Sequence, residues 1–223
     1  MKHKIIMNNI KQAHKVSVMQ GYFDCPHCKR GYVKLPGNKN KTRCPECKGR
    51  PGIDRNKSLS EMLLFTISHL TKSFYYRESC LNGESHYVNE FVNFIHSGDR
   101  NLIWLKHTYE NFMSRSHDGQ IAAALLTIFD LCGYYNIKPD VSQFESGSGF
   151  DGSEEIEDAV FVLIRHVSAI NLFNMEDFVY DISFIIASIL NYCSSRKIDI
   201  QKHIEALIAY ENILHKIDKR ERN

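Results

Sequence analysis

Apolar residues recur at spacings of three and four positions through most of the chain beyond residue 57. This period matches one face of an α-helix, and the alternating β-branched runs that indicate strands are missing from this region. Its single proline, Pro139, leaves room for long helices. The pattern predicts seven helices, over residues 58–78, 85–96, 101–116, 119–135, 154–171, 174–195 and 199–217.

A stretch rich in glycine and serine, 146–153, interrupts the helical pattern. Such a composition is typical of a flexible linker. Ser153, followed by two glutamates, favours the start of a helix there, because acidic side chains are stabilised at a helix N-terminus. We therefore expect a mainly α fold whose helical bundle consists of two units, 58–145 and 154–223, preceded by a small β module.

The two units resemble each other in the placement of their apolar residues. At an offset of 61 residues the following positions coincide: Ile121 with Ile182, Leu125 with Ile186, Ile128 with Ile189, Cys132 with Cys193 and Ile137 with Ile198. Periodic helices share some matches for that reason alone. The offset predicts a duplicated helical unit whose halves pack as a pseudo-symmetric pair.

Four of the seven cysteines form two closely spaced pairs before the helical region. Cys25 and Cys28 enclose Pro-His, Cys44 and Cys47 enclose Pro-Glu, and fifteen residues separate the pairs. Two intervening residues let a tight turn direct both thiolates at one ion, and four thiolates close a tetrahedral site. We expect a zinc ribbon over about residues 20–52 with a structural Zn²⁺; disulfides are the alternative, which a reducing compartment disfavours.

The charge of the chain is unevenly distributed. Residues 1–57 carry fourteen Lys and Arg against three acids, a net of +11, and the remaining residues have a net of −9. A segment this basic is typical of contact with a polyanion, although the two halves could also simply attract each other. The ribbon residues expected to bind nucleic acid through its phosphates are Lys29, Arg30, Lys34, Lys41, Arg43, Lys48 and Arg50. Zinc ribbons also dock proteins, and the sequence leaves the two kinds of partner open.

The composition excludes several classes of protein. Hydrophobic residues make up 43% and charged residues 24%, which is ordinary for a globular protein and too apolar for a disordered one. No apolar run approaches the ~18 residues of a membrane span, and residues 1–9 lack the apolar region of a secretory signal. We therefore expect a cytoplasmic protein without membrane contact. Cys80, Cys132 and Cys193 are expected to be buried free thiols, and Trp104 is expected in the core.

Three stretches of the helical region carry longer motifs. Residues 62–73 read MLLFTISHLTKS, residues 120–137 read QIAAALLTIFDLCGYYNI, and residues 197–205 read KIDIQKHIE. In order, they resemble three segments of the MazG-like all-α nucleoside triphosphate pyrophosphohydrolases. The first is a helix that ends S-E-L-S-E-A, and the second reads E-L-A-D, an apolar helix and then D-L-C-G-Y-L-G-I-D. The third is the closing helix, in which G-I-D-I precedes H-I-E. The resemblance covers about residues 58–217. It implies a helical bundle that binds nucleotides through Mg²⁺.

The chain departs from this family where active members hold the metal. Those enzymes use E-x-x-E on the first helix and E-x-x-D on the second, because clustered carboxylates suit a hard cation that bridges phosphates. The matching positions in the first unit are His69 and Lys72, then Gln120 and Ala123. In the second unit they are His166 and Ala169, then Asp181 and Phe184. A Lys and an Asn of the closing helix that reach phosphate become Leu207 and Glu211.

These substitutions favour a non-catalytic MazG-like protein that binds nucleic acid, a nucleotide or a protein partner. The alternative is an enzyme, a Mg²⁺-dependent pyrophosphohydrolase built on other acids: Glu154, Glu155, Asp158, Asp177 and Asp181. The simpler interpretation of those acids is a solvated helix start and a capped helix entry. A third hypothesis is an assembly or inhibitor subunit that pairs with an active relative.

Two further expectations follow from the resemblance. Asp130 matches an Asp of the family that is not one of the metal ligands, and we expect it to make a supporting hydrogen bond. Active members are commonly dimers or tetramers; an internal duplication could supply that pairing within one chain, and a homodimer stays open as well.

Overall fold

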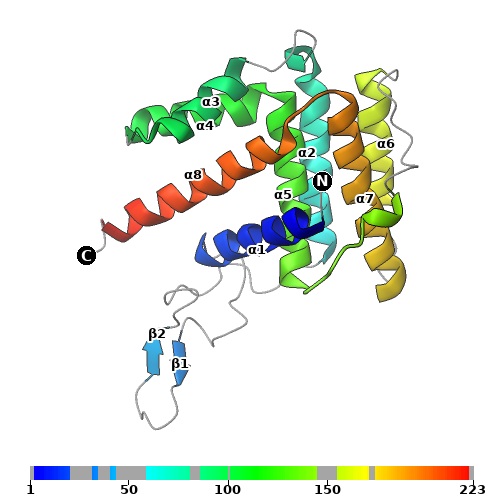
Figure 1. Cartoon of the computed structure of the whole chain (residues 1–223), viewed down its shortest axis with the longest axis horizontal. Helices are drawn as coiled ribbons and strands as arrows, with labels where there is room; N and C mark the ends of the chain where they lie inside the picture. Colours follow the sequence, from blue (N-terminus) through cyan, green and yellow to red (C-terminus); the bar gives the residue numbers. More distant parts are fainter. Residues whose placement is uncertain are drawn as a thin grey trace.

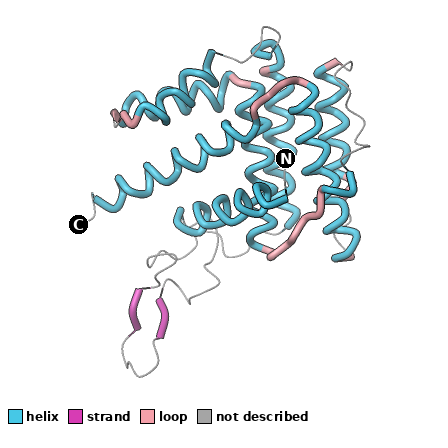
Figure 2. The backbone as a smooth tube through the Cα atoms, viewed as in Figure 1, coloured by secondary structure: helices cyan, strands magenta, loops and turns pink. Residues whose placement is uncertain are grey.

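The computed structural model of the chain describes residues 3–20, 32–34, 41–43, 59–80, 86–99, 101–144, 155–170 and 174–220. Within these ranges the fold is mainly α, as predicted (Figures 1 and 2). The elements are α1 (His3–Gln20), β1 (Tyr32–Lys34), β2 (Lys41–Arg43), α2 (Leu59–Tyr75), α3 (His86–Ser97), α4 (Leu102–Arg115), α5 (His117–Tyr134), α6 (Ile156–Ser168), α7 (Met175–Ser195) and α8 (Ile200–Arg220). Short 3₁₀ turns cover Arg77–Cys80 and Ser142–Phe144.

All seven predicted helices are present, with ends shifted by a few residues. Helix α6 shows why the ends were harder to predict. Its N-terminal cap is Glu155, whose side chain makes no capping hydrogen bond; the predicted cap, Ser153, lies outside the described residues. Helix α5 is capped as its sequence favours, because the Ser116 hydroxyl accepts from the Gly119 N–H at 3.0 Å.

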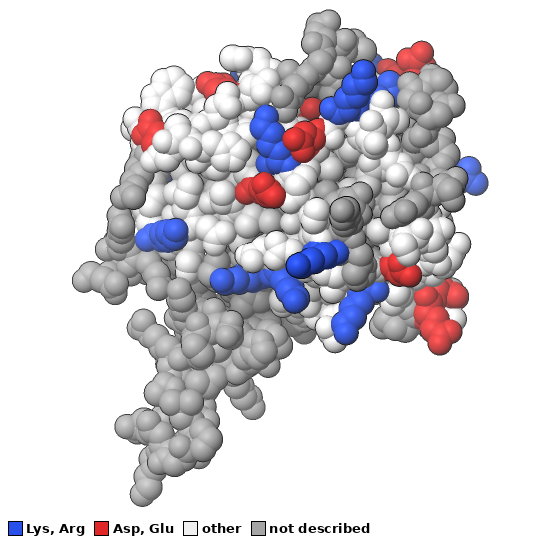
Figure 3. Space-filling view, in the orientation of Figure 1, with Lys and Arg blue, Asp and Glu red and all other residues white. Residues whose placement is uncertain are grey.

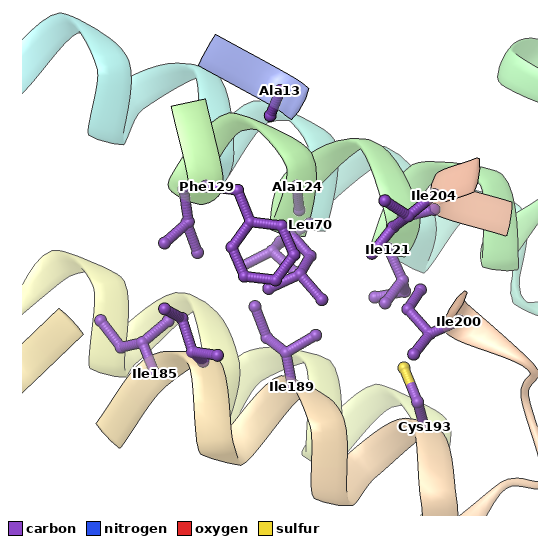
Figure 4. Close-up of a cluster of buried hydrophobic side chains, with 14 of the residues drawn as sticks. Ala13, Leu70, Ile121, Ala124, Phe129, Ile185, Ile189, Cys193, Ile200 and Ile204 are labelled. Carbon is purple, nitrogen blue, oxygen red and sulfur yellow. The ribbon is translucent and has the colours of Figure 1, made fainter. Parts of the chain in front are cut away.

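Four helices form the central bundle in a closed ring of contacts. Helix α2 packs against α5 and α6, and α7 packs against α6 and α5. Their apolar faces meet in one continuous core. Figure 4 shows Leu70 of α2 and Phe129 of α5 facing Ile185 and Ile189 of α7, and all four side chains are buried. Burial of such aliphatic and aromatic groups is the main stabilising contribution in a helical bundle.

The ends of α5 and α7 share one backbone geometry at the predicted offset of 61. Asn136 and Lys197 have φ angles of 54° and 59°, although neither is a glycine. After α5, the Ile137 N–H donates to the Cys132 carbonyl at 2.7 Å; after α7, the equivalent bond from Ile198 measures 2.8 Å. The same cap at both positions is what a repeated helical unit would produce.

Helix α1 was not predicted, because its narrow apolar face is embedded among Lys, His and Asn residues. That face, from Ile6 through Ile10 to Ala13, is buried against α5 and α8. A glycine allows the close approach: a Cβ added to Gly133 of α5 would lie 2.3 Å from the Cβ of His14. Residues 3–20 are therefore part of the helical body.

Helices α3, α4 and α8 extend to one side of the central bundle (Figure 1). Helix α3 packs against α4 and α8, and α8 also contacts α5. An aromatic cluster joins them: Phe91 stacks on Phe112 with ring centroids 4.8 Å apart, and Tyr109 stacks on Tyr210 at 3.9 Å. These contacts join α4 to α3 and to α8, and both α4 and α8 line the cavity described below.

Strands β1 and β2 pair as an antiparallel hairpin. The register pairs Tyr32 with Arg43 and Lys34 with Lys41. The four cysteines predicted to bind zinc, at positions 25, 28, 44 and 47, lie outside the described residues, as does the linker 146–153. The zinc ribbon therefore stays a prediction.

One described helix, α7, is long and apolar enough to cross a membrane by length and composition, over Glu176–Ser195. More than half of that segment, 56%, is buried inside the protein, and it supplies one wall of the central bundle. This burial is what a core helix of a globular domain shows. The expectation of no membrane partner stays a prediction.

Candidate functional site

A cavity of about 310 Å³ opens between α1, α2, α4, α5 and α8. Ten of its fourteen lining residues are apolar or aromatic, among them Met62, Phe65, Tyr109 and Met113. The polar lining residues are His69, Thr127, Asp130 and Glu211. Five helices from both ends and the middle of the chain thus build one concave site. Its volume is at the lower end of the range for small-molecule pockets.

The cavity collects positions that the MazG resemblance assigns to metal and phosphate binding. His69 of α2, Ala123 of α5, and Leu207 and Glu211 of α8 all line it. Gln120 lies one turn before Ala123 and contacts His69, with 2.8 Å between Nδ1 of the imidazole and Oε1 of the amide. Lys72 is exposed and is not among the lining residues.

The hydrogen bonds of Gln120 define the state of His69. The side-chain amide of Gln120 donates to the carbonyl of Met113, so its Oε1 is the acceptor that faces α2. The imidazole of His69 therefore carries its hydrogen on Nδ1. Burial lowers the pKa of His69, and the nearby Lys72 lowers it further, whereas the hydrogen bond that His69 donates to Gln120 raises it. At neutral pH the two side chains form an uncharged pair.

The sequence predicted a supporting hydrogen bond for Asp130; the contact seen here is an ion-pair contact with a histidine that the sequence did not single out. Its carboxylate lies on the cavity wall, 8% exposed, and Oδ1 is 3.4 Å from Nδ1 of His14 on α1. This contact joins α1 to α5 beside Gly133. Asp130 thus holds one wall of the cavity in place.

The second unit has a different arrangement at the matching positions. His166 of α6 and Phe184 of α7 are in ring contact, with centroids 4.7 Å apart. Phe144 packs on the other side of Phe184 at 5.4 Å. Aromatic side chains therefore occupy the place that corresponds to Ala123 in the first unit. Burial lowers the pKa of His166, with a smaller contribution from Arg165.

The acids considered for an alternative metal site do not assemble among the described residues. Glu155 and Asp158 are exposed at the start of α6, and Asp177 is exposed at the start of α7. Glu154 lies outside the described residues. Within the described part of the chain, no group of three or more His, Cys, Asp or Glu side chains is placed to hold a metal ion.

A buried histidine that the sequence did not single out bridges three helices of the bundle. His117, the first residue of α5, donates from Nδ1 to the carbonyl of Ser73 at the end of α2 at 2.9 Å. Its Nε2 accepts from the hydroxyl of Tyr192 on α7 at 2.8 Å. Burial lowers the pKa of His117, with opposing contributions from the Ser73 bond and Asp118. The small Gly119 that follows permits close contact with α4.

Two other sequence predictions have definite outcomes. Cys132 and Cys193 are buried free thiols, as predicted, and burial raises the pKa of both; the side chain of Cys80 lies outside the described ones. The prediction that Trp104 is in the core is wrong, since it is 51% exposed. Helix α4 buries the face of Leu105 and Phe112, and Trp104 lies about a quarter turn away from it.

On the face shown in Figure 3, basic side chains gather in a band over α1, whose Lys4, Lys11 and Lys15 are exposed, whereas basic and acidic side chains of described residues are mixed over the rest of the helical body. Of the seven residues predicted to bind nucleic acid, Lys34, Lys41 and Arg43 lie on the described hairpin strands; Lys29, Arg30, Lys48 and Arg50 lie outside the described residues. The chain matches no protein-family model, no curated protein and no solved structure.

Proposed function

We propose that this protein is a non-catalytic binding protein with a MazG-like helical body and an N-terminal zinc ribbon that contacts nucleic acid. The observation that carries the proposal is the His69–Gln120 hydrogen bond beside the cavity. His69 and Gln120 occupy two positions where the resemblance implies metal-binding carboxylates, and together they form an uncharged pair. The residue one turn beyond Gln120 is Ala123, which has no ligand atom at all.

The argument against family chemistry is one of ligand count. Mg²⁺ requires several oxygen ligands in near-octahedral geometry and is bound through carboxylates together with substrate phosphates. Of the lining residues, only Asp130 and Glu211 carry carboxylates, and Asp130 is engaged by His14. Two carboxylates on different helices are too few to hold Mg²⁺ here. Without the metal ion, the negative charge of a nucleoside triphosphate would stay uncompensated at this site. The protein keeps the cavity but lacks the metal ligands of the active enzymes. This favours a role in ligand binding over nucleotide hydrolysis.

The nucleic-acid part of the proposal depends on the basic segment. Residues 21–57, which follow α1, carry ten Lys and Arg against three acids, a net of +7; the other four basic residues of 1–57 lie in or directly before α1. The hairpin register places the backbone positions of Lys34, Lys41 and Arg43 at neighbouring points of a two-stranded ladder. Zn²⁺ held by the four cysteines would fold this segment, which is too small to stabilise itself through an apolar core. Contacts of this kind bind phosphates without reading sequence.

A gel-shift titration of the full chain with single- and double-stranded nucleic acid tests this proposal. We expect affinity to fall steeply as salt rises from low to physiological concentration, because bound phosphates release counterions. The triple variant Lys34→Ala, Lys41→Ala, Arg43→Ala should reduce both the affinity and the salt slope. Lys106→Ala, an exposed lysine of α4, is the control and should change neither. Absence of binding at low salt would contradict the nucleic-acid role.

Pyrophosphate release from a panel of nucleoside triphosphates with Mg²⁺ or Mn²⁺ tests the rival enzyme hypothesis. We expect no release above the rate without protein. Turnover that is lost in Asp130→Asn or Glu211→Gln would show that the two cavity carboxylates form a working site. Turnover lost in Asp181→Asn would instead locate the chemistry in the second unit. Either result would overturn the non-catalytic proposal.

A further inference from the structure

The two matching sites of the helical body differ in one decisive position. In the first unit this position is Ala123, about one helical turn after Gln120. Its small side chain leaves the cavity beside His69 open. In the second unit the matching residue is Phe184, whose ring lies against His166 at 4.7 Å. A phenylalanine in the second unit thus fills the place that an alanine leaves open in the first. The difference leaves space for a cavity beside His69 in the first unit, whereas a ring lies against the matching His166 in the second.

The charge of the remaining cavity differs from that of a phosphate site. Among its described lining residues there is no Lys or Arg, and two carboxylates, Asp130 and Glu211, are present. His69 is held as a neutral donor to Gln120. Fixed negative charge in a partly desolvated site repels anions and attracts cations more strongly than it would in water. The apolar walls favour a compact ligand with little polar surface.

From this geometry we infer that the cavity binds one compact, largely apolar molecule per chain, which is neutral or cationic and carries no phosphate. The inference rests on the proposed function, because a site that hydrolysed nucleotides would have to accept phosphates. Methionine and aromatic side chains on the walls, Met62, Met113, Phe65 and Tyr109, suit a planar apolar ring. An amine on such a ring would be stabilised by the carboxylate of Glu211, since Asp130 is engaged by His14.

NMR of the full chain labelled at methionine methyl groups tests this inference, because Met62 and Met113 line the cavity and Met7 does not. The probes are tryptamine, neutral indole, indole-3-acetate and MgATP. We expect tryptamine and indole to shift the Met62 and Met113 methyl signals with one equivalent per chain, leaving Met7 unchanged. Indole-3-acetate should bind at least roughly tenfold more weakly than tryptamine. MgATP should shift neither methyl group.

Two variants separate size from charge. Ala123→Phe reproduces the second unit's side chain in the first and should abolish the shifts from every probe, with an unchanged helical circular dichroism spectrum. Glu211→Gln keeps the cavity open and should reduce the preference for tryptamine over indole-3-acetate by about threefold or more. Glu205→Gln makes the same change six residues earlier on α8, at an exposed position outside the cavity, and should leave the preference unchanged.

Several outcomes would overturn the inference. These are binding of MgATP or indole-3-acetate as tight as that of tryptamine, no shift of Met62 or Met113 with any probe, binding of two equivalents per chain, or an unaltered preference in Glu211→Gln. If Ala123→Phe fails to fold, the Glu211→Gln comparison still decides the charge preference. Loss of nucleic-acid binding would leave these signals unaffected, whereas triphosphate turnover would refute the proposed function itself, so the two failures are distinguishable.

Discussion

Replacement of Gly133 by alanine sets two opposing effects against each other, and the structure predicts which is larger. Gly133 lies near the end of α5, where α1 crosses closely. In an exposed helix interior, alanine is about 1 kcal/mol more favourable than glycine. Propensity by itself therefore predicts that Gly133→Ala stabilises the protein.

The contact with α1 reverses that expectation. The added Cβ would lie 2.3 Å from the Cβ of His14, whereas ordinary van der Waals contact begins at 3.4 Å, so α1 must retreat by about 1.1 Å. A Cβ cannot move aside by rotation, because it is fixed to the backbone. Overpacking of this kind costs about 1–3 kcal/mol, and the retreat also loosens the buried face of Ile6 and Ile10. We expect Gly133→Ala to lower the free energy of unfolding by about 1–2 kcal/mol.

Urea denaturation followed by helical circular dichroism measures this change. With an m-value of about 2–3 kcal/mol per molar urea, the midpoint should fall by about 0.5 M. His14→Ala keeps the Cβ that causes the clash, so Gly133→Ala should remain destabilising in that background. His14→Gly removes it and leaves only a milder contact, 3.3 Å from the added Cβ to the Ile10 carbonyl oxygen, so Gly133→Ala should be much less destabilising there. The Asp130 contact is lost in both backgrounds, which makes the pair a matched comparison.

A Gly133→Ala protein that is about 1 kcal/mol more stable than the wild type would refute this reasoning. It would mean that helix propensity dominates and that α1 does not approach α5 at the distance seen in the structure. The wall of the cavity formed by α1 would then have to be reconsidered. Equal effects of Gly133→Ala in the His14→Ala and His14→Gly backgrounds would lead to the same conclusion.

Three further predictions concern the buried polar groups. Tyr192→Phe removes the hydroxyl that donates to Nε2 of His117 and should lower the free energy of unfolding by about 1–3 kcal/mol, because the imidazole acceptor stays buried without that donor; an unchanged urea midpoint would show that the bond does not contribute. Burial lowers the pKa of His69 and His117 in the folded protein, so the unfolded chain takes up protons first as the pH falls. Stability should therefore be greatest above the ordinary histidine pKa of about 6.5 and decline below it, and urea midpoints across this range would contradict the burial argument if they were flat or rose towards acid. Cys132 and Cys193, buried with raised pKa values, should resist iodoacetamide in the native protein and react only after unfolding, as mass spectrometry of the alkylated peptides would show.

The amino-acid sequence by itself determined the helical class and seven of the helices, because a period of three and four residues is a local property of the chain. It also indicated the offset of 61 that reappears in the caps at Asn136 and Lys197. The end of a helix depends on single capping contacts, and those of α6 could not be predicted from its serine and glutamates.

Only the tertiary structure decided which faces are covered and which distant residues meet. Helix α1 was not recognised from its sequence, and its narrow apolar face is buried because Gly133 lets α5 approach it. Trp104 is a residue type common in cores and is exposed here, because α4 buries the face of Leu105 and Phe112 instead. The contact of His69 with Gln120 joins residues that are 51 positions apart. Such proximity depends on how helices pack against one another, and the periodicity of a single helix carries no information about it.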